Sequence, residues 1–324
     1  MKKFFWINGL LISALLSGCG GGGGSGGSAN VGVTAPTPQA PFVVETAVFS
    51  PVTAQAQMIQ STPAPLNQPR LITFDNGYLY VATGVDNSVV RIDANGIQTT
   101  MAGFTGSPVG VAVHNGVLYA TQTGGLYQLN NLSLTNGSSV SVAPQIVANS
   151  SNTSCRNCFG LLFNGDVAYA SNGSTTLQTY DTSNNAWNQV SLSNPAYGLA
   201  LKSNYLSATD YSQAVHVYAI SSITATWSSI AQRTIAGQPY GVAIASNGDV
   251  YVSSYAANTV TRIRGGVVDA APYLDATKVC HPLGLAINES TQSLYVASER
   301  SSASCGLPGQ TTGYILRASI NLSP

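Results

Sequence analysis

One segment with the signals of three short β-strands recurs six times in this chain of 324 residues. In the clearest copy, residues 238–264, the small and β-branched run 241–244 suits a buried strand. The Asn-Gly pair that follows is typical of a hairpin turn, and residues 250–253 return as a second strand. Residues 259–263 alternate between polar and apolar side chains, as a half-buried third strand does.

The other copies begin near residues 69, 108, 158, 196 and 282, which gives a period of about forty residues. Each copy holds three or four strand signals, and none contains a convincing helix pattern. One four-stranded sheet cannot bury both of its faces, whereas several sheets packed radially bury them against one another. The repeat therefore predicts an all-β protein, a six-bladed β-propeller. The glycine near the start of most first strands supports this fold, because inner strands crowd around the axis.

Three features of the copies carry a family resemblance. They are a Pro-x-Gly-hydrophobic-Ala opening, a Tyr-Val-Ala/Ser second strand and an Asn-x-Val-x-Arg-Ile third strand. Together they resemble NHL repeats over roughly residues 69–320. The resemblance implies the propeller fold and says little about function, because NHL-type propellers include enzymes, sensors and binding modules.

The last copy lacks a fourth strand. It ends near Ile320, so another segment has to complete that blade. Residues 42–49, with the sequence FVVETAVF, are the best candidate, because they precede the first copy and have strong strand propensity. We therefore expect a propeller domain at residues 42–324 whose last blade is closed by an N-terminal strand.

The first 18 residues have the features of a signal peptide, with Lys2 and Lys3 before an apolar run too short to span a bilayer. The run ends in Leu16-Ser17-Gly18-Cys19, which resembles a bacterial lipobox. The resemblance implies cleavage before Cys19, attachment of diacylglyceryl to its thiol, and acylation of the new amine by a fatty acid such as palmitate. An ordinary secretory signal with a chance cysteine is the alternative.

Residues 19–41 are rich in Gly and Ser and then in Pro, a composition that predicts a flexible tether. The residue after the lipobox cysteine is Gly20 and not Asp, which in lipoproteins implies sorting to the outer membrane. We expect a lipid-anchored protein of the bacterial envelope whose partners are the membrane and an envelope protein or glycan. Charged residues make up only 7% of the chain and the net charge is zero, so nucleic acid is not an expected partner.

Four cysteines remain besides Cys19, an even number that suits disulfides in an oxidising compartment. In a propeller, the loop that leads into a blade's first strand lies on the same face as the loop between its second and third strands. Cys280 and Cys305 occupy these two loops of the last blade, so we expect them to pair. Cys155 and Cys158 then form a local structural pair, with a redox-active CxxC motif as the alternative.

In propellers of this type, ligands usually bind at the central opening on that same face. Projecting the repeat onto the face gives these candidate ligand residues: Asn87, Asn172, Asp210, Tyr255, Asn258, His281, Glu299 and Arg300. His281 at the mouth is either a general base or a packed loop residue. We find no nucleophile elbow, phosphate-binding glycine loop or HExxH motif, so no residue is assigned as catalytic.

The sequence favours a non-catalytic module that presents its loops to a protein, a glycan or a small ligand. The alternative is a divalent-metal-dependent hydrolase or lactonase similar to gluconolactonase-like propellers. That resemblance implies Ca²⁺ on the axis, held by Glu299, Asp210 and Asn172 or Asn258. No other cofactor is expected. An accessory subunit of an envelope complex is a third interpretation.

Five tyrosines fall at matching second-strand positions: Tyr80, Tyr119, Tyr169, Tyr251 and Tyr295. Repetition at one structural position predicts a packing layer between blades. An aromatic platform for sugar binding is the alternative.

Overall fold

The computed structural model describes residues 56–59, 66–130, 132, 134–147, 155, 158–220, 225–299, 305 and 313–323. These residues all belong to one compact unit, Pro38–Pro324. They form strands and no α-helix, and none of them belongs to a helix that could span a membrane. The predicted signal peptide, Cys19, the tether and Arg300 lie outside the described residues.

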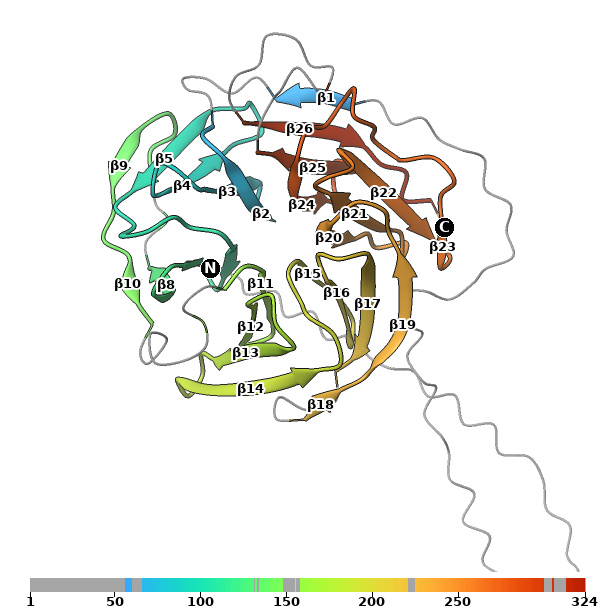
Figure 1. Ribbon diagram of the computed structural model, residues 1–324. Coiled ribbons are helices and arrows are strands. Elements are labelled where there is room, and N and C mark those ends of the chain that lie inside the picture. Colours follow the sequence, from blue (N-terminus) through green and yellow to red (C-terminus); the bar gives the residue numbers. More distant parts are fainter. Residues whose placement is uncertain are drawn as a thin grey trace, which may run out of the picture. The chain divides into compact units, whose positions relative to one another are not determined.

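Six separate sheets are arranged as blades around a central axis, which confirms the predicted all-β propeller (Figure 1). Blade 1 consists of β2 (Pro69–Asp75), β3 (Tyr78–Thr83), β4 (Ser88–Ile92), β5 (Gln98–Ala102) and β9 (Ser139–Ser141). Blade 2 consists of β6 (Val111–His114), β7 (Val117–Gln122), β8 (Gly125–Leu129) and β10 (Gln145–Ile146). Blade 3 consists of β11 (Leu161–Asn164), β12 (Val167–Ser171), β13 (Thr176–Asp181), β14 (Ala186–Leu192) and β18 (Thr226–Trp227).

The second half of the ring follows the same pattern. Blade 4 consists of β15 (Leu199–Lys202), β16 (Tyr205–Thr209), β17 (Ala214–Ala219) and β19 (Ser229–Thr234). Blade 5 consists of β20 (Pro239–Ile244), β21 (Val250–Ser254), β22 (Thr259–Arg264) and β23 (Val267–Val268). Blade 6 consists of β24 (Pro282–Asn288), β25 (Ser293–Ser298), β26 (Tyr314–Ser319) and β1 (Ala56–Ile59).

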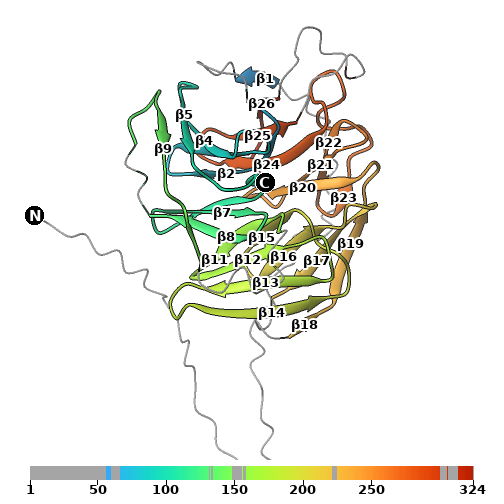
Figure 2. The ribbon, with the colours of Figure 1, turned by 60° about the vertical axis from the view of Figure 1, so that its left-hand side comes forward.

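Strand β1 closes the ring. It pairs antiparallel with β26, with Met58 opposite Leu316, so an N-terminal strand completes the last blade as predicted (Figure 2). The residues that do so are Ala56–Ile59. The segment proposed from the sequence, residues 42–49, lies outside the described residues.

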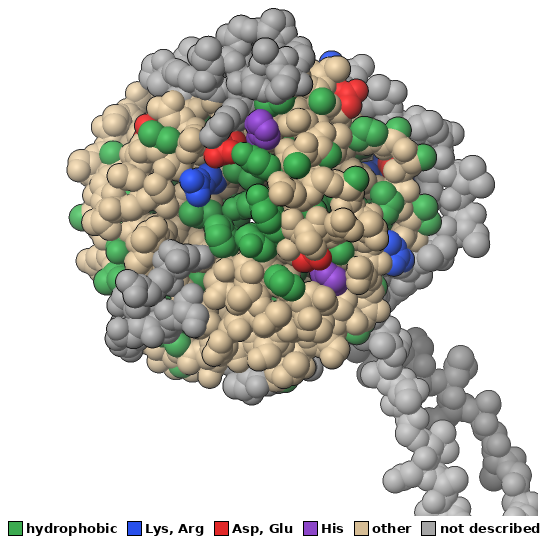
Figure 3. Space-filling model, viewed as in Figure 1, with side chains coloured by type: hydrophobic (Ala, Val, Ile, Leu, Met, Phe, Trp, Pro, Cys, Tyr) green, Lys and Arg blue, Asp and Glu red, His purple; other side chains and the backbone are tan. Residues whose placement is uncertain are grey.

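Successive antiparallel strands reverse direction, so each blade has its loops on two faces. We call the front face the one that carries the loops leading into first strands and the loops between second and third strands. The back face carries the turns between first and second strands and between third and fourth strands. Figures 1 and 3 look onto the front face.

The inner strands approach one another so closely that glycine is required. A Cβ on Gly198 would lie 2.0 Å from the carbonyl oxygen of Tyr240, and one on Gly241 would lie 2.0 Å from that of Leu283. Gly110, Gly160 and Gly284 show the same conflict with the next blade at 2.1 to 2.5 Å. Neither Gly198 nor Gly241 has a positive φ, so close packing explains these glycines and backbone conformation does not.

A buried hydroxyl on the second strand links each of four blades to the next. In blade 4, Thr209 Oγ1 accepts the N–H of Gly198 at 2.9 Å and donates to the carbonyl of Tyr240 at 2.6 Å. Ser253 makes the same two bonds to Gly241 and Leu283, at 2.8 and 2.7 Å. Thr121 and Ser171 do the same in blades 2 and 3. These hydroxyls fix the spacing of the inner strands.

The repeated second-strand tyrosines are buried, with exposed fractions of 0% to 8%. Each packs among side chains of a neighbouring blade; Tyr80, for example, lies in one cluster with Val111, Leu118 and Ala120 of blade 2. The predicted packing layer between blades is therefore confirmed.

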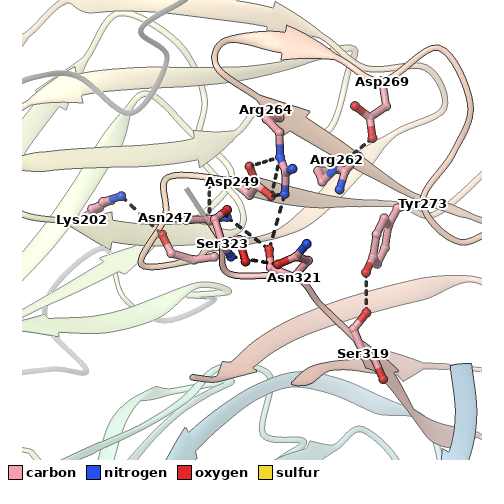
Figure 4. A network of polar contacts seen from close by, with 11 residues as sticks. Lys202, Asn247, Asp249, Arg262, Arg264, Asp269, Tyr273, Ser319, Asn321 and Ser323 are labelled. Atoms are coloured by element: carbon pink, nitrogen blue, oxygen red, sulfur yellow. Dashed lines mark hydrogen bonds and ion pairs between the residues drawn. The ribbon is translucent and has the colours of Figure 1, made fainter. Parts of the chain in front are cut away.

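The end of the chain is held on the back face by polar contacts (Figure 4). Asp249 is buried and accepts two hydrogen bonds from Nε of Arg264, at 2.8 and 2.9 Å. Asn247 and Arg264 donate to the carbonyl of Asn321. The residues after β26 thus lie between blades 5 and 6.

Candidate functional site

An aromatic cluster lies at the central opening of the front face. We define the axial aromatic cluster as Phe159, Tyr197, Tyr211, Tyr240 and Tyr255, which pack with Leu71 and Leu283. The ring centroid of Tyr197 is 5.1 Å from that of Phe159 and 5.0 Å from that of Tyr211. Hydrophobic side chains gather around the axis on this face, with a few charged and histidine side chains nearby (Figure 3).

The inner-strand glycines explain why these rings meet. Phe159, Tyr197 and Tyr240 each directly precede the axial glycine of their blade. The hydroxyl links hold the carbonyls of these three residues in place, so their side chains come together at the mouth of the axis. Tyr211 and Tyr255 reach the cluster from the loops between second and third strands.

The axis is narrow behind the aromatic cluster and wider toward the back face. A cavity of about 30 Å³ lies between inner strands that include Gly160, Gly198 and Gly241. A second cavity of about 330 Å³ is lined by the first strands of all six blades, with Phe74 and Phe163 near their back-face ends. The axial aromatic cluster forms the floor of the front opening.

Charged groups flank this floor. The hydroxyl of Tyr255 donates to Glu299 Oε2 at 3.0 Å, and the Tyr255 ring lies 4.7 Å from the ring of His281. Burial raises the pKa of Tyr240, while the nearby Arg70 acts in the opposite direction. The Nε of Arg70 is buried and has no hydrogen-bond partner within the described part of the chain.

The structure places most predicted site residues in the front loops, where they bind their own loops. The Oδ1 atom of Asp210 accepts the N–H groups of Ser212, Gln213 and Ala214. Burial alone would raise the pKa of Asp210, but hydrogen bonds from Ala214, Ser212 and His216 outweigh it and lower the pKa.

The amide candidates also accept bonds from loop groups. Asn258 Oδ1 accepts the N–H of His281, in the loop that leads into blade 6, at 2.8 Å. Asn172 Oδ1 accepts both the N–H and the hydroxyl of Ser174. Asn87 is exposed and has a φ of 47°, as expected of a turn residue. Of the predicted set, these contacts bring together Tyr255, Asn258, His281 and Glu299.

These residues do not fit a divalent cation on the axis. A calcium site needs several oxygen ligands that point to one centre. The oxygens of Asp210 and Asn172 instead accept bonds from their own loops, that of Asn258 accepts the N–H of His281 in the next blade's entry loop, and the middle of the opening is apolar. The one metal-like group of His, Cys, Asp and Glu side chains found in the described ranges is Cys280, His281 and Cys305.

Both cysteine pairs are disulfides, as predicted. Cys280 is bonded to Cys305, with a Cα–Cα distance of 5.5 Å, and Cys155 is bonded to Cys158, with a distance of 4.9 Å. A disulfide sulfur is not a thiolate, so the group around His281 is a poor metal site. Its place is structural, beside the axial opening.

Sequence reasoning missed several members of the site. His216 had no partner visible in the sequence, but its Nε2 lies 3.2 Å from Oδ2 of Asp210. Phe159 and Arg70 were not proposed. The sequence signal for both is their place in the repeat: Phe159 directly precedes the axial glycine Gly160, and Arg70 directly precedes Leu71, which stands at the equivalent position of blade 1.

No family model matches this chain, and no curated protein sequence matches it. The NHL resemblance and the lipobox are thus not confirmed by these comparisons. Many solved structures share the fold. One is a luciferin-regenerating enzyme with a TM-score of 0.65 and 13% identity, covering 82% of this chain and 95% of that one.

Two further solved structures are similar to this chain. The calcium-binding protein regucalcin from Agrobacterium tumefaciens has a TM-score of 0.61 and 12% identity, with 84% and 97% of the two chains covered. A gluconolactonase from Xanthomonas campestris has a TM-score of 0.60 and 11% identity, with 83% and 90% covered. At this identity the similarities establish the fold, and the class of protein is a six-bladed β-propeller.

Proposed function

We propose that the protein is an enzyme that acts on a small, uncharged ring compound lying on the axial aromatic cluster. The observation that carries the proposal is the meeting of aromatic side chains from blades 3, 4 and 5 beside Glu299. Aromatic floors with a few well-placed polar groups are typical of small-molecule sites. The named neighbours that act on small molecules, among them a gluconolactonase and a streptogramin B lyase, support the enzyme class.

Hydrolysis of a cyclic ester is the reaction that these residues support best. Glu299 is partly exposed at the edge of the floor, where its carboxylate would take a proton from the attacking water. As the ring C–O bond of the ester breaks, the protonated Glu299 would return that proton to the leaving alkoxide oxygen. The guanidinium of the half-buried Arg70 would donate through its terminal nitrogens to the carbonyl oxygen of the substrate. The proposal differs from a metal-dependent lactonase, because the oxygens on the front face do not converge on a metal.

The test is a panel of sugar lactones, aliphatic lactones and aryl esters, assayed with and without EDTA. We expect turnover that EDTA leaves unchanged and that Glu299→Gln lowers roughly 100-fold or more. Glu289→Gln is the matched control, because Glu289 lies on the back face and accepts bonds from Ser246. Loss of activity with EDTA would instead favour the metal-dependent hydrolase. Ligand binding without any turnover would favour the non-catalytic binding module.

We also propose that the chain is anchored to the bacterial outer membrane through lipid on Cys19. The two disulfides support an oxidising compartment. Labelling of growing cells with radioactive palmitate should mark the wild-type protein but not Cys19→Ser. Equal labelling of the two, or an unprocessed N-terminus, would refute the anchor.

A further inference from the structure

A groove of about 560 Å³ lies between blades 6 and 1. Its walls come from the back-face turns of both blades, namely the β2–β3 and β4–β5 turns of blade 1 and the β24–β25 turn of blade 6. This volume is in the range of roughly 300–1,000 Å³ that is typical of clefts for small ligands. The groove is on the face opposite the axial aromatic cluster, so it is independent of the function proposed above.

Three equivalent arginines show what is unusual about this groove. Arg91, Arg262 and Arg317 each lie opposite a second-strand tyrosine in the register of their blades. Arg91 donates to the carbonyls of Leu132 and Leu134 and lies over the ring of Tyr78. The segment that contains Leu132 and Leu134 thus covers the guanidinium of Arg91.

The second equivalent arginine is also covered. Arg262 Nε donates to Asp269 at 2.8 Å, and its guanidinium lies 5.4 Å from the ring centroid of Tyr273. Arg317, in contrast, is exposed and lines the groove. Its one bond to the described residues is from Nε to the hydroxyl of Ser293, at 2.9 Å. The terminal nitrogens of Arg317 are therefore able to donate to a ligand.

Aromatic rings form the apolar wall of the groove. Phe74 and Tyr295 both line it, with their ring planes 5° apart and their centroids 5.8 Å apart. Tyr295 is 8% exposed and belongs to the packing layer between blades, whereas Phe74 is only partly buried. The Phe74 side chain thus offers apolar surface to a ligand in the groove.

Polar groups of both kinds face this wall. Donors come from Arg317, and acceptor oxygens come from Asp93, which lines the groove at the β4–β5 turn; Asn288 lines it at the β24–β25 turn, but its Oδ1 is bonded to Ser290 and Thr291. The charges of Arg317 and Asp93 are opposite, so the site has no net preference for an anion or a cation. Asp93 and Asn288 also hold their own turns, which fixes the positions of their oxygens.

We infer that this groove binds a saccharide. A pyranose ring has an apolar face of C–H groups, which packs on an aromatic side chain, and an edge of hydroxyls that both donate and accept hydrogen bonds. The groove matches both features without requiring a charge on the ligand. One or two sugar units lie against Phe74, and their hydroxyls bond to Arg317 and Asp93.

The experiment measures binding of a panel of neutral sugars to the full chain in detergent by isothermal titration calorimetry. The panel contains maltose, cellobiose, lactose and N,N′-diacetylchitobiose. Two variants change the groove without touching buried core. Arg317→Gln replaces the guanidinium donors by a shorter, neutral amide. Ala94→Trp fills the space, because Ala94 is exposed on the β4–β5 turn and lines the groove.

Lys278→Gln is the matched control, since it removes one exposed positive charge from a loop on the front face. We expect one sugar class to bind, a loss of affinity of at least tenfold in Arg317→Gln, no detectable binding to Ala94→Trp, and wild-type binding to Lys278→Gln. Melting curves of the three variants should match the wild type. The inference is overturned if no sugar on the panel binds, or if Ala94→Trp binds as the wild type does.

Discussion

The hydroxyl links between inner strands make a quantitative prediction about Thr209. This residue is fully buried, and its hydroxyl joins the N–H of Gly198 to the carbonyl of Tyr240 in the next blade. Thr209→Val keeps the shape of the side chain but removes both hydrogen bonds. A buried polar group left without a partner costs about 1–3 kcal/mol, so we expect a loss of about 2–3 kcal/mol in the free energy of unfolding.

Equilibrium unfolding in urea, followed by tyrosine and tryptophan fluorescence, measures this loss. Thr209→Ser keeps the hydroxyl and removes one methyl group, and it should cost only about 1 kcal/mol. Thr234→Val makes the same change as the test variant at an exposed position of β19 and should be nearly neutral. The reasoning fails if the valine variant at position 209 is as stable as the wild type, or if serine there costs as much as valine.

Three further predictions concern charges and cross-links. Asp249→Asn leaves the guanidinium of Arg264 without its carboxylate partner and should cost about 3 kcal/mol in the same urea titration; a change below about 0.5 kcal/mol would contradict this. The double variant of Cys280 and Cys305 to Ser opens a link across 25 residues and should cost about 3 kcal/mol, and peptide mapping without reduction should find this link in the wild type and no cross-pairing with Cys155. Because the pKa of Asp210 is lowered in the folded state, its contribution is present above the ordinary value of about 3.9 and is lost as the pH falls below it. In Asp210→Asn, the free energy of unfolding should therefore fall less steeply as the pH is lowered below about 4. The same pH dependence in the variant and the wild type would refute a stabilising role for the Asp210 carboxylate.

The repeat made the fold predictable because each blade carries its own strand and turn signals. Gly198, Gly241 and the second-strand tyrosines are local signs of crowding at the axis and packing between blades, and the structure explains them in these terms. The disulfides followed from the propeller geometry, since loops on one face bring Cys280 and Cys305 together.

The features that the sequence missed depend on contacts between repeats. Strand β9 pairs in parallel with β5 of blade 1, and β18 pairs in parallel with β14 of blade 3. Both strands are too short for their sequences to give a strand signal. The closing strand was expected, but its residues, AQMI, lack the apolar run that drew attention to residues 42–49.

The candidate site was predictable in its location and not in its chemistry. Projecting the repeat placed Asp210, Asn172 and Asn258 near the axis, but it could not show that their oxygens accept bonds from N–H groups of the front loops. Three of the rings that meet at the axis come from the positions before the glycines, where the repeat places unrelated residues such as Val109 and Phe159; Tyr211 and Tyr255 come from the projected loops, and Tyr255 was predicted.

The most direct test of the account is a crystal structure of the Glu299→Gln variant soaked with the best substrate from the lactone and ester panel. We predict that the ring of the substrate lies on Tyr197, Tyr211 and Tyr240 at the front opening, with its carbonyl toward Arg70. Substrate bound only elsewhere, with the axial aromatic cluster covered by solvent, would contradict the account.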